Sequence, residues 1–179
     1  QGLDTGDMIL VNSFDILPED TSADVFEKMA AIGADALAEA LIQIENGAAR
    51  REKQDDARAS YAKMIAKEDG QIDWKQPSER IVNLIRGLNP WPSAYTFYEG
   101  SALKIWRAET VDGYENGVPG EVLAAVKNKG FVVKTGDSAV LVTEVQAVGS
   151  KKMGAADYLR GHDIPLGTIL QPPMPAEEF

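Results

Sequence analysis

Residues 86–92 read Arg-Gly-Leu-Asn-Pro-Trp-Pro, and this segment separates two kinds of hydrophobic pattern. Upstream, four apolar residues recur at the spacing of one helix face: Ile81, Leu84, Ile85 and Leu88. Downstream, residues 94–98 read as a strand. Each proline disfavours the α conformation in the residue before it, so a helix cannot pass through Asn89 or Trp91. The segment therefore predicts a helix-to-strand corner, with Trp91 as a core side chain.

The rest of the pattern predicts one long helix and a set of short strands. Thr21 followed by Asp24 is a capping-box pattern, and the helix it begins is expected to end at Gly47. Shorter helices are expected over residues 77–87 and 155–160, and Asp73-Trp74 is expected to be a turn with a buried anchor. Strands are expected over residues 94–98, 102–109, 120–126, 130–134 and 139–147, with a last one over 165–170. Short strands separated by glycine turns are typical of a small sandwich or an OB-like barrel.

The composition excludes several kinds of site. The chain has 179 residues, no cysteine and one histidine, His162. Disulfides, thiol catalysis and a multi-histidine metal site within the chain are thereby excluded, and we predict no metal and no membrane partner. The net charge of −10 argues against a general nucleic-acid binder. Residues 75–179, however, carry 11 basic and 12 acidic side chains, a net charge of −1, and their basic residues can still form a patch.

Four segments, in this order, resemble the methionyl-tRNA formyltransferase family. They are Gly-Leu-Asp-Thr-Gly-Asp-Met-Ile at residues 2–9, Asp73-Trp74 with residues 86–92, Pro-Gly-Glu-Val-Leu at residues 119–123, and Gly-Ser-Lys-Lys-Met with Ala-Asp-Tyr-Leu at residues 149–159. Together they extend over nearly the whole chain. The resemblance implies an α+β chain: the tail of a Rossmann-like α/β formyltransferase domain (1–47), a linker (48–75), a small OB-like β-barrel domain (76–171) and a tail (172–179).

The family transfers a formyl group from 10-formyltetrahydrofolate to the amino group of methionyl initiator tRNA. The resemblance implies that Asp4 is the catalytic carboxylate and that Leu3, Asp4 and Gly6 lie at the folate site. A carboxylate beside a histidine can organise the proton transfers that accompany amine attack on the formyl carbon. The family's asparagine and histidine precede the Asp-Thr-Gly turn and do not occur in this sequence, and His162 is interpreted as a surface histidine. We therefore expect the C-terminal portion of a longer, monomeric protein of the bacterial cytoplasm or an organellar matrix, inactive by itself.

The resemblance also implies that the OB-like domain contacts tRNA. Basic side chains are the candidates, because contacts of this kind go mainly to phosphates. They are Lys104, Arg107, Lys151, Lys152 and Arg160, with Arg50 and Arg51 from the linker. Trp106, on an expected strand, is interpreted as a core residue rather than as a stacking surface for a base.

Other functions remain open at this point. A formyltransferase acting on a nucleotide-linked amino sugar shares the Asp-Thr-Gly turn, and a non-enzymatic OB-like module could bind single-stranded nucleic acid. The same three residues occur in aspartic proteases, where the carboxylate activates water. That reading is disfavoured, because no strands precede the motif in this sequence to hold it.

Overall fold

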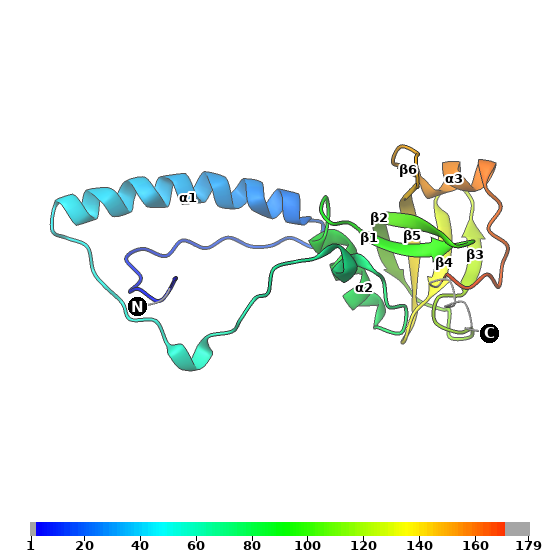
Figure 1. The fold of residues 1–179 in the computed structure, drawn as a ribbon, viewed down its shortest axis with the longest axis horizontal. Helices are drawn as coiled ribbons and strands as arrows, with labels where there is room; N and C mark the ends of the chain where they lie inside the picture. The colour runs from blue at the N-terminus through cyan, green and yellow to red at the C-terminus, as the bar shows by residue number, and fades with distance from the viewer. Residues whose placement is uncertain (1–2, 171–179) are drawn as a thin grey trace, which may run out of the picture. The chain divides into compact units, whose positions relative to one another are not determined.

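The computed structural model describes residues 3–170, and the chain divides into two compact units, Gln1–Met64 and Ile65–Phe179 (Figure 1). The expected tail, residues 172–179, lies outside the described residues. The predicted division into a domain remnant, a linker, a barrel domain and a tail stays a prediction.

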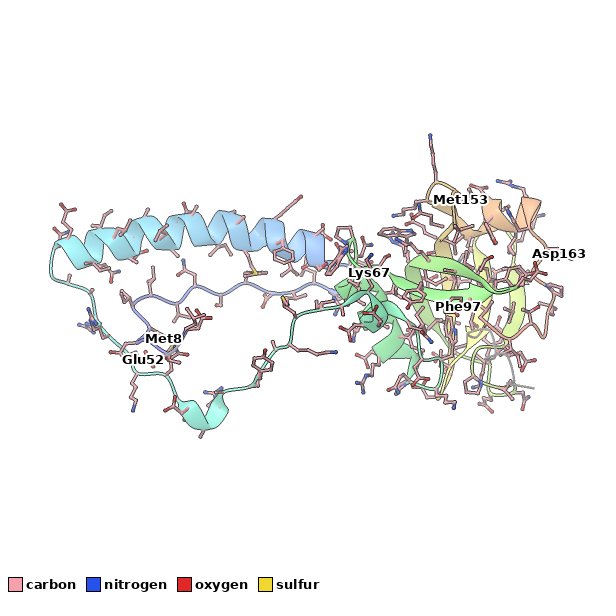
Figure 2. The ribbon with its side chains drawn as sticks, in the orientation of Figure 1. Met8, Glu52, Lys67, Phe97, Met153 and Asp163 are labelled. Carbon is pink, nitrogen blue, oxygen red and sulfur yellow. The ribbon has the colours of Figure 1, made fainter. Side chains whose placement is uncertain are left out.

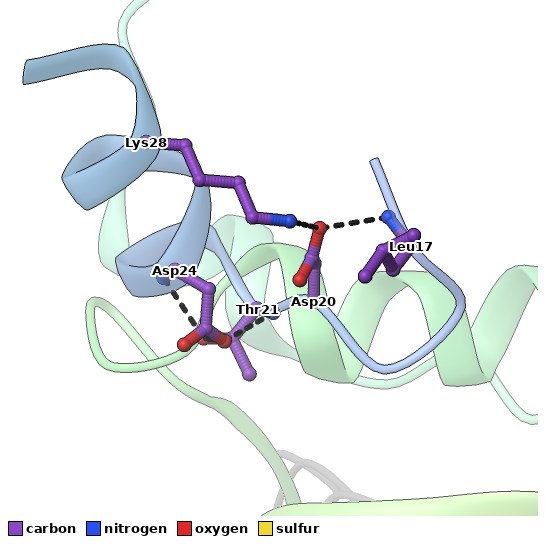
Figure 3. A network of polar contacts seen from close by, with 5 residues as sticks. All are labelled: Leu17, Asp20, Thr21, Asp24 and Lys28. Atoms are coloured by element: carbon purple, nitrogen blue, oxygen red, sulfur yellow. Dashed lines mark hydrogen bonds and ion pairs between the residues drawn. The ribbon is translucent and has the colours of Figure 1, made fainter. Parts of the chain in front are cut away.

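The first unit contains one long helix, α1 (Ser22–Glu45), whose predicted capping box is confirmed. The Asp24 carboxylate accepts a hydrogen bond from the Thr21 backbone N–H at 2.8 Å, and the Thr21 hydroxyl oxygen accepts one from the Asp24 N–H at 3.4 Å (Figure 3). Asp20 accepts hydrogen bonds from the Lys28 ammonium and the Leu17 N–H, and these bonds lower the pKa of the Asp20 carboxyl. Gly47, at φ +65°, follows the last turn as expected.

The apolar stripe of α1 is not covered by the described part of the chain. None of the helix residues is buried, and the Phe26 and Leu37 side chains are 70% and 62% exposed. Around the helix the first unit is mostly irregular, with one short 3₁₀ turn, η1 (Asp56–Arg58). Met8 and Glu52 pair in an antiparallel bridge through two backbone hydrogen bonds of 2.8 and 2.9 Å (Figure 2).

The second unit is an antiparallel sheet with two helices. A 3₁₀ turn, η2 (Lys67–Gly70), and helix α2 (Ser78–Gly87) come first, and helix α3 (Ala155–Gly161) comes last. The strands are β1 (Ala94–Tyr98), β2 (Ser101–Val111), β3 (Val122–Val126), β4 (Gly130–Lys134), β5 (Ala139–Ala147) and β6 (Met153–Gly154). Their order is β1-β2-β5-β4-β3, with β6 paired to β5. Helix α2 packs against β2, and α3 packs against β4 and β5 (Figure 1).

The α+β class is confirmed, but the expected closed barrel is wrong for the residues described: β1 and β3 form the two edges and do not pair with each other. The reason is that other segments occupy both edges. The Ile72 N–H donates to the Tyr95 carbonyl at 2.8 Å, beside β1. The Val122 N–H donates to the Thr168 carbonyl at 2.8 Å, beside β3, so the expected strand 165–170 is reduced to a single bridge at Ile169.

The described residues form a larger hydrophobic cluster on one face of the sheet, closed by a buried polar chain, and a smaller one of Val132, Ala139 and Leu141 on the other face. Phe131, on β4, is fully buried. The Trp74 indole N–H donates to the Thr96 hydroxyl at 3.0 Å, and that hydroxyl donates to the Leu170 carbonyl at 3.3 Å. Buried polar groups are stable only when they are paired, and these three segments are far apart in sequence. The prediction that Trp74 is a buried anchor is therefore confirmed.

The corner at residues 88–92 forms where it was expected, but its tryptophan does not enter the core. Helix α2 ends at Gly87, and the peptide bonds before Pro90 and Pro92 are both cis. Leu88 completes the buried helix stripe, and Ser93, at φ +70°, is buried at the start of β1. The Trp91 side chain is 58% exposed. The core prediction for Trp91 is wrong because the helix has already ended, and the turn carries its indole away from the stripe.

Gly130 begins β4 where a side chain has no space. A Cβ there would collide with the Val142 carbonyl oxygen and lie 2.9 Å from the Ala155 Cβ. We expect Gly130→Ala to lower the free energy of unfolding by about 2–3 kcal/mol, as overpacking of a tight core does. Gly87→Ala is the matched control, because nothing beyond its chain neighbours and the backbone of its own helix lies within 4 Å of a Cβ built there. It should leave the free energy of unfolding unchanged or raise it by up to about 1 kcal/mol, since alanine favours a helix more than glycine does. Urea unfolding followed by circular dichroism gives both values, and equal effects would contradict this packing.

Asp137 connects the β4–β5 turn to the start of α2. Its carboxylate accepts hydrogen bonds from the Ser78 N–H at 2.8 Å, the Thr135 hydroxyl at 3.0 Å and the Ser138 N–H at 2.7 Å. The bond from Ser78 is the main cause of a lowered pKa of Asp137 in the folded chain. A lowered folded-state pKa stabilises the fold above the unfolded pKa of about 3.9, and this stabilisation is lost as the pH falls through the folded value.

Asp137→Asn should therefore be less stable than the parent at neutral pH and lose less stability between about pH 5 and pH 2. The measurement is urea unfolding across that pH range. Asp112→Asn, in an exposed loop, serves as the control for removing one carboxylate. An unchanged acid profile in Asp137→Asn would show that this carboxylate does not contribute to acid sensitivity.

Candidate functional site

The predicted catalytic turn is held by one side chain of the same unit. The Gln54 amide donates to the Asp4 carbonyl at 2.9 Å and to the Gly6 carbonyl at 2.7 Å. Asp4 has φ +58° and lines a cleft of about 430 Å³ with Thr5, Met8 and residues 52–56 and 58–59. Leu3 is 95% exposed, and no described atom lies within 4 Å of a Cβ built on Gly6. The catalytic role of Asp4 stays a prediction.

The seven predicted tRNA-binding residues fall in both units. Arg50 and Arg51 belong to the first unit, where they line a cleft of about 410 Å³ with Glu52 and residues 8–11. The other five belong to the second unit. The structure therefore brings together Arg50 with Arg51 in the first unit, and Lys104 with Lys152 and Arg107 with Arg160 in the second. Lys151 is exposed in the turn that precedes β6.

Lys104 and Lys152 meet at the ring of Trp106. Their ammonium nitrogens lie 5.7 and 5.4 Å from the centroid of the indole. Trp106 is half-buried and belongs to neither hydrophobic cluster of the described residues. The interpretation of Trp106 as a core residue is therefore wrong. The physical reason is the alternation of β2: Leu103 and Ile105 face the core, so Trp106 lies on the opposite face together with Lys104.

Arg107 and Arg160 line a groove of about 1,020 Å³. Its other lining residues come from β2, β3, the β3–β4 turn, β5, β6 and α3: Glu109, residues 125–129, Thr143, Glu144, Gly154, Ala156, Asp157 and Leu159. Lys127 and Lys129 are two cations of this groove that the sequence interpretation missed. Their signal was the Lys-Asn-Lys triplet in a turn between two expected strands.

Lys152, next to the groove, and Arg160, in the groove, are paired with carboxylates that phosphates can replace. The Lys152 ammonium lies 2.6 Å from a Glu144 carboxylate oxygen, and Arg160 pairs with Asp157. Ion pairs between exposed side chains contribute little to stability, because water screens both charges. A phosphate can therefore take the place of either carboxylate without a large cost to the fold.

Helix α3, which carries Arg160, is held in place by Tyr158. This side chain is 5% exposed and stacks on the ring of His162 at a centroid distance of 4.2 Å. Burial raises the pKa of the Tyr158 phenol, and the nearby Glu99 carboxylate adds to the effect, so the phenol stays neutral. The His162 residue itself is exposed, which confirms the prediction of a surface histidine.

Residues 3–170 contain neither a candidate metal site nor a candidate membrane-spanning helix. No three His, Asp or Glu side chains there are grouped in a way that would hold a metal ion. None of the helices in that range combines the length and the apolar character that crossing a bilayer requires.

The described part of the second unit is an antiparallel sheet with a helix before it and a helix after its last strand. The family model described as "Formyl transferase, C-terminal domain" matches residues 64–163, which is more than half of the chain. The chain therefore belongs to the formyl transferase C-terminal domain family.

Similar proteins extend the match into the first unit. A methionyl-tRNA formyltransferase of Caldanaerobacter subterraneus subsp. tengcongensis is 49% identical over 171 residues, which cover 96% of this chain and 55% of that protein. A methionyl-tRNA formyltransferase of Halothermothrix orenii is 43% identical over 175 residues, which cover 95% and 55%. The chain thus spans about half the length of these relatives.

Solved structures with lower identity share the fold. HypX from Aquifex aeolicus, in complex with tetrahydrofolic acid, has a TM-score of 0.63 at 22% identity and covers 87% of this chain and 28% of that one. WlaRD, a sugar 3N-formyl transferase, has a TM-score of 0.61 at 21% identity and covers 84% and 52%. At these identities the likeness establishes the fold alone.

Proposed function

We propose that the chain is part of a methionyl-tRNA formyltransferase, which transfers a formyl group from 10-formyltetrahydrofolate to the amino group of methionyl initiator tRNA. The observation that carries the proposal is 49% identity, over 96% of the chain, to a protein of that name. In this proposal the second unit contacts the tRNA, and Asp4 belongs to the catalytic site. The bacterial relatives support a location in the cytoplasm, with an organellar matrix as the alternative. We also propose that the protein is a monomer.

The proposed role of Asp4 is to manage protons during the transfer. When the α-amino group of methionine attacks the formyl carbon, the nitrogen becomes positively charged and must lose a proton. A carboxylate within hydrogen-bond reach can accept that proton, and such assistance contributes about 10²–10⁴-fold to a rate. The position of Asp4 at a cleft, on a turn held by Gln54, is compatible with this role.

The described residues can form only a small part of a binding site for the folate donor. A ligand pocket is usually lined mainly by apolar and aromatic side chains. The cleft at Asp4 is lined instead mostly by polar residues, with Met8 and Ala59 among its few apolar members, and Leu3 points into open space at 95% exposure. We therefore assign to this chain only the Asp4 carboxylate and the turn that carries it.

The first unit is proposed to belong to the formyltransferase domain, as the resemblance implies. A helix as long as α1 usually owes its stability to packing of its apolar face. In α1 that face is exposed within the described residues. We therefore propose that another surface of the complete enzyme covers the apolar face of α1.

An amino-sugar formyltransferase is the second candidate function. Its support is the TM-score of 0.61 to a sugar 3N-formyl transferase, but the identity there is 21%. The 49% identity to a methionyl-tRNA formyltransferase favours tRNA as the substrate.

The catalytic proposal predicts that Asp4→Asn abolishes most of the activity in a complete enzyme. The suitable protein is a chimera in which this chain replaces the matching part of the Caldanaerobacter relative. We expect the chimera to formylate methionyl-tRNA, and Asp4→Asn to lower kcat by at least about 100-fold, because the amide cannot accept the proton. Initial rates with 10-formyltetrahydrofolate measure this. The 179-residue chain alone should give no turnover.

Asp15→Asn, also an exposed carboxylate of the first unit, is the matched control and should keep kcat within about twofold of the parent chimera. A fully active Asp4→Asn chimera would contradict the role of Asp4. Turnover by the isolated chain would contradict the assignment of the remaining catalytic groups to other parts of the enzyme.

The tRNA proposal predicts that the 179-residue chain binds methionyl-tRNA with a steep dependence on salt. Each phosphate contact releases a counterion, so replacing both Lys151 and Lys152 by Gln should lower the slope of log K against log salt by about two. Filter binding between about 50 and 200 mM KCl measures the slope.

The control is Lys67→Gln together with Lys75→Gln, two exposed lysines of the same unit outside the groove and the Trp106 ring. This double variant removes the same charge and should leave the slope nearly unchanged. A flat salt response of the parent chain would contradict phosphate binding, and equal losses in both double variants would contradict the location of the contact.

A further inference from the structure

Strand β2 contains an extra residue at Trp106, whose ring already lies opposite the core by the alternation of Leu103 and Ile105. Leu103 and Ile105 are buried in the larger core cluster, and the next residue of β2 that packs against it is Ala108, three positions on. The register agrees, because Ile105 pairs with Val145 and Arg107 with Glu144, which leaves Trp106 as the additional residue. A bulge of this kind locally changes the direction of side chains. Without it, Arg107 would occupy the core-facing position.

Strand β5 carries the matching irregularity at the same level. Its core residues are Val140, Val142 and Val145, again with a step of three. Arg107 pairs with Glu144 and Ala108 with Val142, so Thr143 is the additional residue of β5. The Thr143 hydroxyl donates to the Arg107 carbonyl at 3.4 Å. The two extra residues thus restore the core alternation and leave a polar outward face around Trp106.

The indole of Trp106 is held in one orientation. Its N–H donates to the Gln146 side-chain oxygen at 3.1 Å, and the Gln146 amide donates to the Ser150 carbonyl at 2.8 Å. The Trp106 backbone carbonyl, at the bulge, accepts a hydrogen bond of 3.4 Å from the Asn89 side chain in the corner segment. A ring fixed in this way loses little freedom when a flat ligand stacks on it.

The charges around the ring indicate the chemistry of the ligand. The two ammonium groups of Lys104 and Lys152 lie within 6 Å of the indole centroid, where a cation interacts favourably with the ring face. The outward neighbours on β2 and β5 are polar, which differs from the largely apolar centre of a protein–protein interface. Because both ammonium groups lie over the ring, a base that stacks there displaces them toward its phosphates, and an aromatic ring with cations close by is one way in which proteins bind a nucleotide.

We propose that Trp106 is a stacking residue for an unpaired nucleobase of the RNA substrate, with Lys104 and Lys152 on the adjoining phosphates. The Lys152 ammonium exchanges its Glu144 partner for a phosphate when the RNA binds. This inference rests on the proposed function, because the RNA is the tRNA of that proposal. It adds a specificity for unpaired nucleotides, which contacts to phosphates alone do not provide.

The test compares two substitutions of Trp106 in the 179-residue chain. Trp106→Phe keeps an aromatic face, whereas Trp106→Leu keeps an apolar side chain without one. Loss of one base–aromatic stack weakens binding by at least about fivefold. We expect that loss with methionyl-tRNA for Trp106→Leu, with an unchanged salt slope, and a loss of less than about threefold for Trp106→Phe.

Two polyanions without an accessible base serve as controls. Heparin and a fully paired RNA duplex should bind Trp106→Leu and the parent chain equally well. If Trp106→Leu weakens binding to heparin or to the duplex as much as binding to tRNA, the ring only positions the lysines, and the stacking proposal is overturned. Urea midpoints of both variants establish that the fold is retained.

Fluorescence tests the stacking in a chain with Trp106 unchanged. Trp91→Phe removes the other exposed indole and leaves Trp74, which is 5% exposed. Addition of methionyl-tRNA should quench the fluorescence of Trp91→Phe and leave that of Trp91→Phe/Trp106→Phe nearly constant. No difference between them overturns the proposal even if Trp106→Leu fails to fold.

The outcomes separate the two proposals. If the parent chain binds methionyl-tRNA and Trp106→Leu binds it equally well, the stacking role is overturned while the proposed function stands. If the parent chain binds no tRNA, both are overturned.

Discussion

A strand can place only every second residue on a given face of its sheet, and this rule governs β2 and β5 of the second unit. β2 and β5 form the most extensive pairing of the sheet, and both must keep apolar residues on the core side. Each strand contains one residue too many for a simple alternation. Because the two extra residues lie at the same level, the core alternation resumes beyond them, and Arg107 and Glu144 stay in contact with water. The register of β2 with β5 thus determines both which residues enter the core and which lie on the candidate RNA-binding face.

Much of this architecture follows from local patterns in the sequence. The capping box at Thr21, the anchor at Trp74 and the main strands were predicted because each depends on residues close in the chain. The open sheet was not predicted, since its edges are covered by residues near Ile72 and Thr168, which are distant in sequence. Hydrophobic periodicity carries no information about such pairings.

The outward position of Trp106 could have been predicted from the alternation of β2, and the sequence also contains a sign of the bulge beside it. Leu103 and Ile105 set a core alternation that would place Arg107 inside. A charged residue at a core position indicates a bulge when no partner is available to neutralise it. The exposed Trp91 was misassigned because large apolar residues are assumed to be buried, and this one follows a helix that has already ended. The roles of Leu3, Asp4 and Gly6 came only from family resemblance, and they stay predictions.

The role of Trp106 is tested most directly by the indole N–H signals of the chain in a ¹H–¹⁵N correlation spectrum. These signals are followed during titration with methionyl-tRNA. The three tryptophans give three such signals, one each from Trp74, Trp91 and Trp106. A base stacked on Trp106 should shift its signal, while the signal of the buried Trp74 should stay in place. A titration that reaches saturation without moving the Trp106 signal would contradict the account.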